Sequence, residues 1–89
     1  MRLELSKALD RFLARIPKKH AGQITRKIDE LLINPYPIDS KLLSGIPLYR
    51  VDVGEYRIAY RAYTTMLVVV LVGKRNDGDV YRRLARMFR

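Results

Sequence analysis

The sequence has no cysteine, no tryptophan and a single histidine among its 89 residues. Without cysteine the chain forms no disulfide, no cysteine-ligated zinc or iron–sulfur site and no thiol nucleophile. One histidine is too few for a histidine-based zinc hydrolase or a histidine dyad. Catalysis, if the chain performs any, therefore rests on arginine, lysine, tyrosine or carboxylate side chains.

The sequence also lacks long hydrophobic runs. The longest, Met66 to Val72, is far shorter than the roughly 20 residues that a membrane helix needs. The first residues contain no apolar stretch of the signal-peptide type. We therefore expect a soluble, cytoplasmic protein without membrane contacts, built as one domain over residues 1–89.

Acidic residues are scarce relative to basic ones. The chain has 18 Lys and Arg against 9 Asp and Glu, a net charge of +9. This excess is divided almost evenly between the two halves of the chain, and 48% of all residues are hydrophobic. The charge therefore belongs to a folded surface rather than to a basic tail, and a polyanion is the partner that it favours.

The first part of the sequence has the three- and four-residue apolar spacing of amphipathic helices. Ser6 is a suitable cap for a first helix, which Pro17 interrupts. A second helix is expected over roughly 18–33, before Asn34-Pro35-Tyr36-Pro37 stops it. Leu3 and Leu5 alternate with charged residues and indicate a short first strand. The remaining stretch to Pro47 is expected to be a loop.

After Pro47 the apolar spacing changes to two, which is typical of strands. We expect strands over 48–53, 56–62 and 66–72 and a short terminal helix over 80–88. The last strand is apolar on both faces and should lie centrally in the sheet. The predicted fold class is α+β: an antiparallel sheet with an N-terminal helical hairpin packed on one face and a short C-terminal helix.

Alternation sorts the strand side chains onto two faces. Ile58 belongs to an apolar face, which we expect the helices to cover. Arg50, Arg57 and Arg61 lie on the opposite face together with Asp52, and we expect that face to carry no helix. An antiparallel pair needs one solvated face in any case, so these arginines serve either solubility or function.

Three segments in order carry a resemblance to a known family. They are Lys41-Leu42-Leu43-Ser44-Gly45 followed by Leu48-Tyr49-Arg50-Val51, the hairpin Val53-Gly54-Glu55-Tyr56-Arg57-Ile58-Ala59-Tyr60, and Val72-Gly73-Lys74-Arg75 with Asp79-Val80-Tyr81 just beyond. Over essentially the whole chain, the sequence resembles the RelE/ParE toxins of type II toxin–antitoxin pairs. The resemblance implies the α+β fold described above, of the kind found in RelE and related microbial ribonucleases.

The resemblance also implies one of two activities. RelE-like members are mRNA interferases that usually cut mRNA in the ribosomal A site, without metal or other cofactor, through attack of the ribose 2′-hydroxyl on the adjacent phosphodiester. ParE-like members instead inhibit DNA gyrase and lack the cleavage residues. The implied partners are mRNA, the ribosome with its rRNA, and a small acidic RelB-like antitoxin that is largely disordered until bound. A non-toxic basic nucleic-acid-binding module is a third interpretation.

For the cleaving members, the resemblance assigns catalytic roles to Arg57, Arg75, Tyr81 and Arg50. Asp52 departs from the family, which tends to have a second basic residue at that position. We expect Asp52 to form an ion pair with Arg50 or Arg61, although a carboxylate there is also a candidate general base. Tyr81 is likewise a candidate base if cationic neighbours activate it. The sequence does not assign the base.

Other basic residues are candidates for RNA contact. The alternative for these residues is a solvated charged surface, and the alternative for Tyr81 is a packing role on the terminal helix. His20 receives no role, and the tyrosines at 49, 56 and 60 are expected to fill the core or its rim. The candidate RNA-binding residues are Lys74, Arg61, Arg82, Arg83, Lys18 and Lys19, with Lys74 also a possible general acid.

Overall fold

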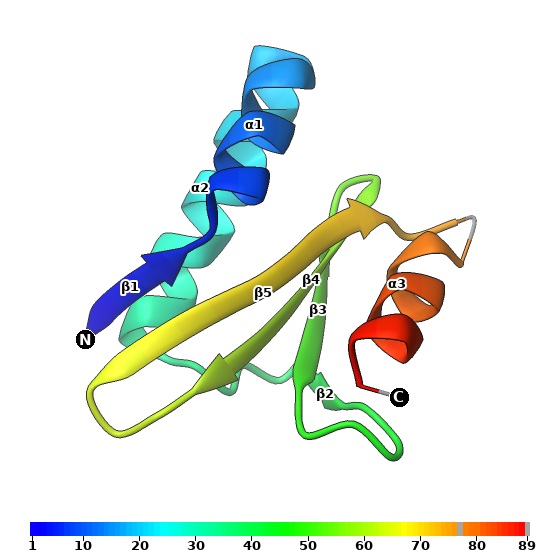
Figure 1. Ribbon diagram of the computed structural model, residues 1–89. Coiled ribbons are helices and arrows are strands. Elements are labelled where there is room, and N and C mark those ends of the chain that lie inside the picture. Colours follow the sequence, from blue (N-terminus) through cyan, green and yellow to red (C-terminus); the bar gives the residue numbers. More distant parts are fainter. Residues whose placement is uncertain (77, 89) are drawn as a thin grey trace.

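The computed structural model describes residues 1–76 and 78–88, which form a five-stranded sheet with helices on both faces (Figure 1). The strand order across the sheet is β1-β5-β4-β3-β2. The elements in chain order are β1 (Arg2–Leu5), α1 (Lys7–Arg15), α2 (Lys18–Ile33), β2 (Lys41–Leu42), β3 (Tyr49–Val53), β4 (Tyr56–Ala62), β5 (Met66–Lys74) and α3 (Asp79–Met87).

The sheet is mixed. Strands β2 to β5 pair antiparallel in chain order, whereas β1 runs parallel to β5, from Arg2 opposite Met66 to Leu5 opposite Val69. The predicted α+β class is therefore confirmed, and β5 lies between two strands as expected. The prediction of a wholly antiparallel sheet was wrong for β1. The helical hairpin separates β1 from β2 in the chain, so no tight turn joins the two strands. β1 instead lies beside the last strand, β5, and runs parallel to it.

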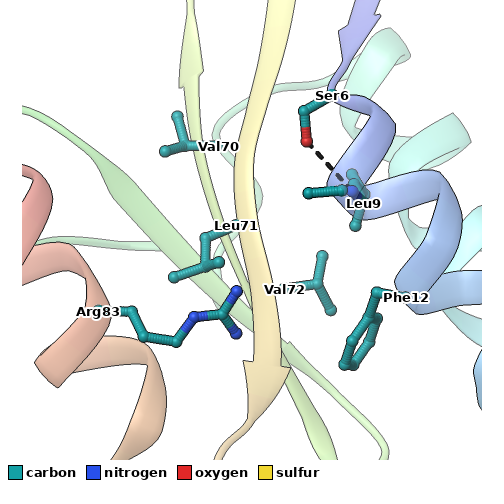
Figure 2. Close-up of a pocket in the computed structure, with 8 residues that line it drawn as sticks. Ser6, Leu9, Phe12, Val70, Leu71, Val72 and Arg83 are labelled. Carbon is teal, nitrogen blue, oxygen red and sulfur yellow. Dashed lines mark hydrogen bonds between the residues drawn. The ribbon is translucent and has the colours of Figure 1, made fainter.

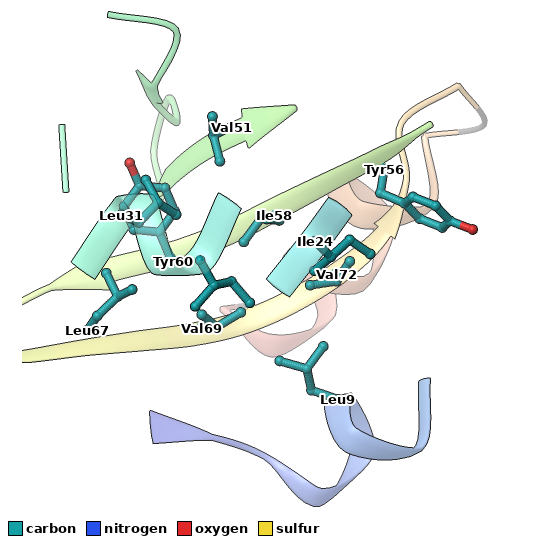
Figure 3. Close-up of a cluster of buried hydrophobic side chains, with 11 residues drawn as sticks. Leu9, Ile24, Leu31, Val51, Tyr56, Ile58, Tyr60, Leu67, Val69 and Val72 are labelled. Carbon is teal, nitrogen blue, oxygen red and sulfur yellow. The ribbon is translucent and has the colours of Figure 1, made fainter. Parts of the chain in front are cut away.

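One face of the sheet is covered by α1 and α2, as the spacing of their apolar residues predicted. The Oγ of Ser6 accepts the Leu9 N–H at 3.1 Å and caps α1. Below the helices, Ile24 and Leu31 of α2 pack against Ile58 of β4 with no exposed surface on any of the three (Figure 3). Burial of side chains of this size contributes about 1.5–3 kcal/mol each, so this layer stabilises the fold most.

The opposite face is not free of helices, contrary to our expectation. Helix α3 packs on it through Val80 and Leu84, against Ala59 and Leu71. The reason is the composition of β5, since an apolar residue such as Leu71 on the second face needs its own cover. Met87 and Phe88, at the other end of α3, remain exposed.

Smaller differences concern element ends. Lys41 and Leu42 form a two-residue strand at the edge of β3, where a loop was expected, and β5 continues two residues past Val72. The buried Tyr56 and Tyr60 and the half-buried Tyr49 occupy the core and its rim, as predicted. No helix in the described part of the chain is long and apolar enough to cross a membrane.

Candidate functional site

The centre of the site is a two-point ion pair across the β3–β4 hairpin. Asp52 lies directly opposite Arg57, whose Nε donates to Oδ1 at 2.7 Å and whose Nη2 donates to Oδ2 at 3.1 Å. The side chains are only 28% and 14% exposed, respectively. Such charge-assisted two-point pairs are strong and fix the guanidinium plane. The ion pair predicted for Asp52 is therefore present, although its main partner is Arg57.

Arg50 and Arg61, the two arginines predicted to pair with Asp52, lie at different distances from it. The Nη1 of Arg50 lies 3.7 Å from Oδ1 of Asp52 and makes a looser second contact. Arg61 lies four residues along β4 from Arg57, about 13 Å at 3.3 Å per residue, and its guanidinium stacks instead over the ring of Tyr63 at 4.9 Å. Arg61 is therefore not part of the ion-pair site.

Tyr81 joins the site from α3. The Cζ of Arg57 lies 5.1 Å from the centroid of the Tyr81 ring, in the range of a cation–π contact. Gly73 lies opposite Arg57 in β5, and a Cβ built there would come within 2.9 Å of the Val80 side chain. The missing side chain at position 73 therefore allows α3 to approach the sheet closely enough to bring Tyr81 over Arg57.

Arg75 follows β5 directly and lies at the same end of the sheet. Its backbone N–H donates to the carbonyl of Glu55 in the β3–β4 turn at 3.1 Å. Its charge also acts on Asp52, as described next. Of the sequence-predicted residues, Arg50 and Arg57 thus contact the Asp52 carboxylate, and Tyr81 contacts Arg57. Arg75 lies at the same end of the sheet, and we call these four residues together with Asp52 the arginine cluster.

The charges of the arginine cluster shift two pKa values in opposite directions. The hydrogen bonds from Arg57 hold the pKa of Asp52 below its ordinary value, and the charges of Arg57, Arg50 and Arg75 lower it further against the opposing effect of burial. The hydrogen bond to Asp52 raises the pKa of Arg57. Asp52 is therefore an anion and Arg57 a cation throughout the neutral range.

The remaining predicted RNA-binding residues lie around the cluster rather than in it. Lys74 is exposed but pairs with Tyr56 across the sheet, so it shares the face that α1 and α2 cover. On α3, Arg82 is exposed, and Arg83 forms an ion pair with Asp79 at 3.3 Å. Lys18 and Lys19, both exposed, begin α2.

His20 has a structural role that the sequence did not indicate. Its Nδ1 lies 2.9 Å from the hydroxyl of the buried Tyr56, and its Nε2 lies 3.5 Å from the carboxylate of Glu55. These contacts tie the start of α2 to the β3–β4 turn, which in turn accepts the Arg75 N–H. Because the partners are 36 residues apart, no local pattern could have revealed them.

A separate small cavity of about 40 Å³ lies along β5, between α1 and α3 (Figure 2). Leu9 and Phe12 line it from α1, Val72 from β5, and Arg83 reaches it from α3. Beyond Val69 no strand among the described residues pairs with this edge of β5, because β1 ends at Leu5. The arginine cluster does not line this cavity and is a surface site.

The arrangement suits the binding of a phosphodiester. Guanidinium groups bind phosphate oxygens at two points and remain protonated at any physiological pH. Two of them meet at one carboxylate here, Arg57 lies next to an aromatic ring with a hydroxyl, and the charge of Arg75 acts on the same carboxylate. Preorganised cations of this kind stabilise charge that develops on a phosphoryl group in a transition state.

The elements described above define an α+β protein with a mixed five-stranded sheet, a helical hairpin on one face and a short terminal helix on the other. No protein-family model and no curated protein matches the sequence. Solved structures of the toxin RelE from E. coli, however, are similar to it over almost the whole chain.

Three of these RelE structures give the extent of the similarity. A free variant of E. coli RelE with two arginines changed to alanine matches with a TM-score of 0.79 and 22% identity, over 99% of this chain and 97% of its own. Isolated E. coli RelE matches with a TM-score of 0.72 and 22% identity, over 99% and 98%. The same variant in complex with a peptide of the antitoxin RelB matches with 0.72 and 23%, over 93% and 92%. The chain therefore has the RelE fold, as the resemblance predicted.

Proposed function

We propose that this chain is a RelE-like toxin of a type II toxin–antitoxin pair, which cuts mRNA on the ribosome in the cytoplasm. The observation that carries the proposal is the arginine cluster on a RelE fold. Arg57 is held in one orientation by Asp52 and Tyr81, Arg50 makes a second contact with the same carboxylate, and the charge of Arg75 acts on it. Each residue type for which the resemblance predicted a catalytic role is present in this cluster.

The proposed reaction is an internal phosphoryl transfer in the RNA. The 2′-oxygen forms a bond to phosphorus as the bond from phosphorus to the 5′-oxygen breaks, which leaves a 2′,3′-cyclic phosphate and a 5′-hydroxyl. The proton lost by the 2′-hydroxyl is balanced by the proton that the leaving 5′-oxygen gains. Arg57 and Arg75 stabilise the negative charge of the intermediate, and one such contact contributes about 3–4 kcal/mol in comparable sites. The Tyr81 hydroxyl is the candidate for proton transfer.

One observation favours the second candidate function, inhibition of DNA gyrase without cleavage. Asp52 introduces a negative charge where the cleaving family members tend to have a second basic residue, and it pairs with Arg57 itself. A carboxylate so placed reduces the charge available for a phosphate. The presence of Arg57, Arg75 and Tyr81 in one cluster is the reason that we place RNA cleavage first.

The proposed antitoxin is an acidic peptide that folds on this surface. One of the similar RelE structures is a complex with a RelB antitoxin peptide, and this chain has a net charge of +9. Opposite charge speeds the encounter, and a disordered partner can cover a large surface at the cost of its ordering entropy. We propose that such a peptide covers the arginine cluster or displaces α3, which carries Tyr81.

The proposal is tested by expressing the chain in bacteria and mapping the 5′ ends of cellular transcripts. New ends at positions aligned with codons are expected soon after induction, and co-expression of the neighbouring open reading frame should suppress them. DNA damage without new transcript ends would instead identify a gyrase inhibitor. If neither is observed, the chain is a binding module, and both toxin interpretations fail.

A further inference from the structure

The pairing of Asp52 with Arg57 leaves a defined part of the guanidinium unoccupied. A guanidinium has five N–H donors, and the carboxylate takes one at Nε and one at Nη2. The edge between Nη1 and Nη2 keeps its donors, while the Tyr81 ring covers one face of the group. A phosphate bound at this edge would therefore leave both hydrogen bonds to Asp52 in place.

We propose that Asp52 is a positioning residue for Arg57, which holds the guanidinium so that its free Nη1–Nη2 edge meets the scissile phosphate. Asp52 itself neither binds the RNA nor takes a proton in the reaction. This inference rests on the proposed RNA cleavage and assigns a role to the residue that departs from the family pattern.

The surroundings of Asp52 argue against a role as general base. Both oxygens of Asp52 already accept hydrogen bonds from Arg57, and Arg50 lies 3.7 Å from Oδ1. Arg75 adds a third positive charge, and together the guanidiniums keep the pKa of the carboxyl low. A carboxylate so stabilised as an anion is a weak proton acceptor.

The place of Asp52 also explains how Arg50 and Arg57 can lie on one sheet face. Arg50 and Arg57 are both largely covered, with side chains 20% and 14% exposed. A partly buried cation without a partner is costly, and like charges on neighbouring strands repel each other. One carboxylate between them offsets both effects and leaves the cluster positive overall.

The test compares Asp52→Asn with Asp39→Asn on single-turnover and steady-state cleavage of RNA. Asp39 also forms an ion pair, with Lys27 at 3.0 Å, so both variants lose one paired carboxylate.

We expect Asp52→Asn to lower kcat about ten- to hundredfold, because Arg57 is then misoriented. KM should not increase, because the substitution removes a negative charge that would repel RNA. Asp39→Asn should stay within about twofold of the wild type. Higher activity of Asp52→Asn would identify Asp52 as an inhibitory competitor of phosphate and overturn the inference.

A double-mutant cycle separates positioning from proton transfer. If Asp52 acts only through Arg57, Asp52→Asn should have no further effect on kcat in an Arg57→Ala background. A general base would lower kcat again in that background, since its proton transfer does not need Arg57. A further loss of about tenfold or more would therefore overturn the inference.

A third readout does not depend on RNA cleavage. In the wild-type protein, inorganic phosphate should shift the NMR signals of the Arg57 Nη groups and leave the Nε–H signal in place. On acidification the Nε–H signal should move only below the pH at which ordinary aspartates titrate, because Arg50, Arg57 and Arg75 lower the pKa of Asp52. A shift of Nε–H with phosphate would mean that the anion displaces Asp52, which contradicts the inference. If the wild type cuts no RNA, the proposed function fails, whereas this readout still tests the positioning of Arg57.

Discussion

The two faces of the sheet are built from alternate residues of the same strands, and they differ in what covers them. In β4, Ile58 and Tyr60 point toward α1 and α2 and are fully buried, whereas Arg57 points to the other face and pairs with Asp52. On that second face α3 covers only a smaller apolar cluster, which includes Leu71, and it places Tyr81 over Arg57. One face thus stabilises the fold, and the other combines a smaller core with a charged surface.

The charged face can hold its arginines in place because the apolar face fixes the strands. Cross-strand partners such as Asp52 and Arg57 therefore meet without further ordering. Functional groups on such a rigid scaffold lose little entropy when they bind a ligand. The same division predicts that substitutions on the two faces will have different consequences.

The largest effect on stability is expected from a cavity in the core of the apolar face. Leu31→Ala removes a fully buried side chain and should lower the free energy of unfolding by about 2–5 kcal/mol, with the cooperative transition of the whole chain shifted. Leu84→Ala removes an equally buried side chain below α3. Because α3 packs only on the smaller of the two clusters, we expect its amides to lose hydrogen-exchange protection before those of β4 and β5 do. Equal loss of protection in all three elements would contradict this distinction.

An intermediate effect is expected from closing the space between α3 and β5. In Gly73→Ala the new methyl group would lie 2.9 Å from Val80, so α3 must shift, at a cost of about 1–3 kcal/mol. RNA cleavage should fall more than stability does, since the shift moves Tyr81 away from Arg57. The matched control is Gly22→Ala in α2, where the new methyl group meets no atom within 4 Å. Chemical denaturation and cleavage rates of both variants provide the measurement, and equal behaviour of the two would refute the role of the close approach.

The smallest effect is expected at the β3–β4 turn, where His20 of α2 contacts Tyr56 and Glu55. His20→Ala removes the partner of the Tyr56 hydroxyl and should lower the free energy of unfolding by about 1 kcal/mol. The amide of Arg75, which bonds to the carbonyl of Glu55 in this turn, should then exchange faster. Unchanged exchange at Arg75 would show that the turn is held without His20.

Much of this arrangement could be predicted because it depends on local patterns. The alternation in β4 placed Ile58 and Arg57 on opposite faces, and the spacing of Ile24 and Leu31 identified the buried side of α2. The register of the hairpin was also available, since the two-residue turn at Gly54-Glu55 places Asp52 opposite Arg57. The ion pair of Asp52 was nevertheless predicted with Arg50 or Arg61 rather than with Arg57.

The rest depends on contacts between distant segments. The parallel pairing of β1 with β5, the docking of α3 through Val80 and the bond between His20 and Tyr56 each join residues without a shared local pattern. The apolar character of β5 on both faces was a signal for the position of α3, since a second apolar face needs a cover. The prediction placed β5 centrally in the sheet but left its second face without a helix.

The central claim is that the arginine cluster on the charged face is a site of RNA cleavage that contributes little to stability. Arg75→Ala tests it most directly, because this exposed residue follows β5 and its backbone, not its side chain, holds the turn. We expect cleavage of transcripts, mapped by their 5′ ends, to fall about a hundredfold or more, while the free energy of unfolding changes by no more than about 0.5 kcal/mol. Cleavage within about twofold of the wild type, or loss of cleavage only together with unfolding, would contradict the account.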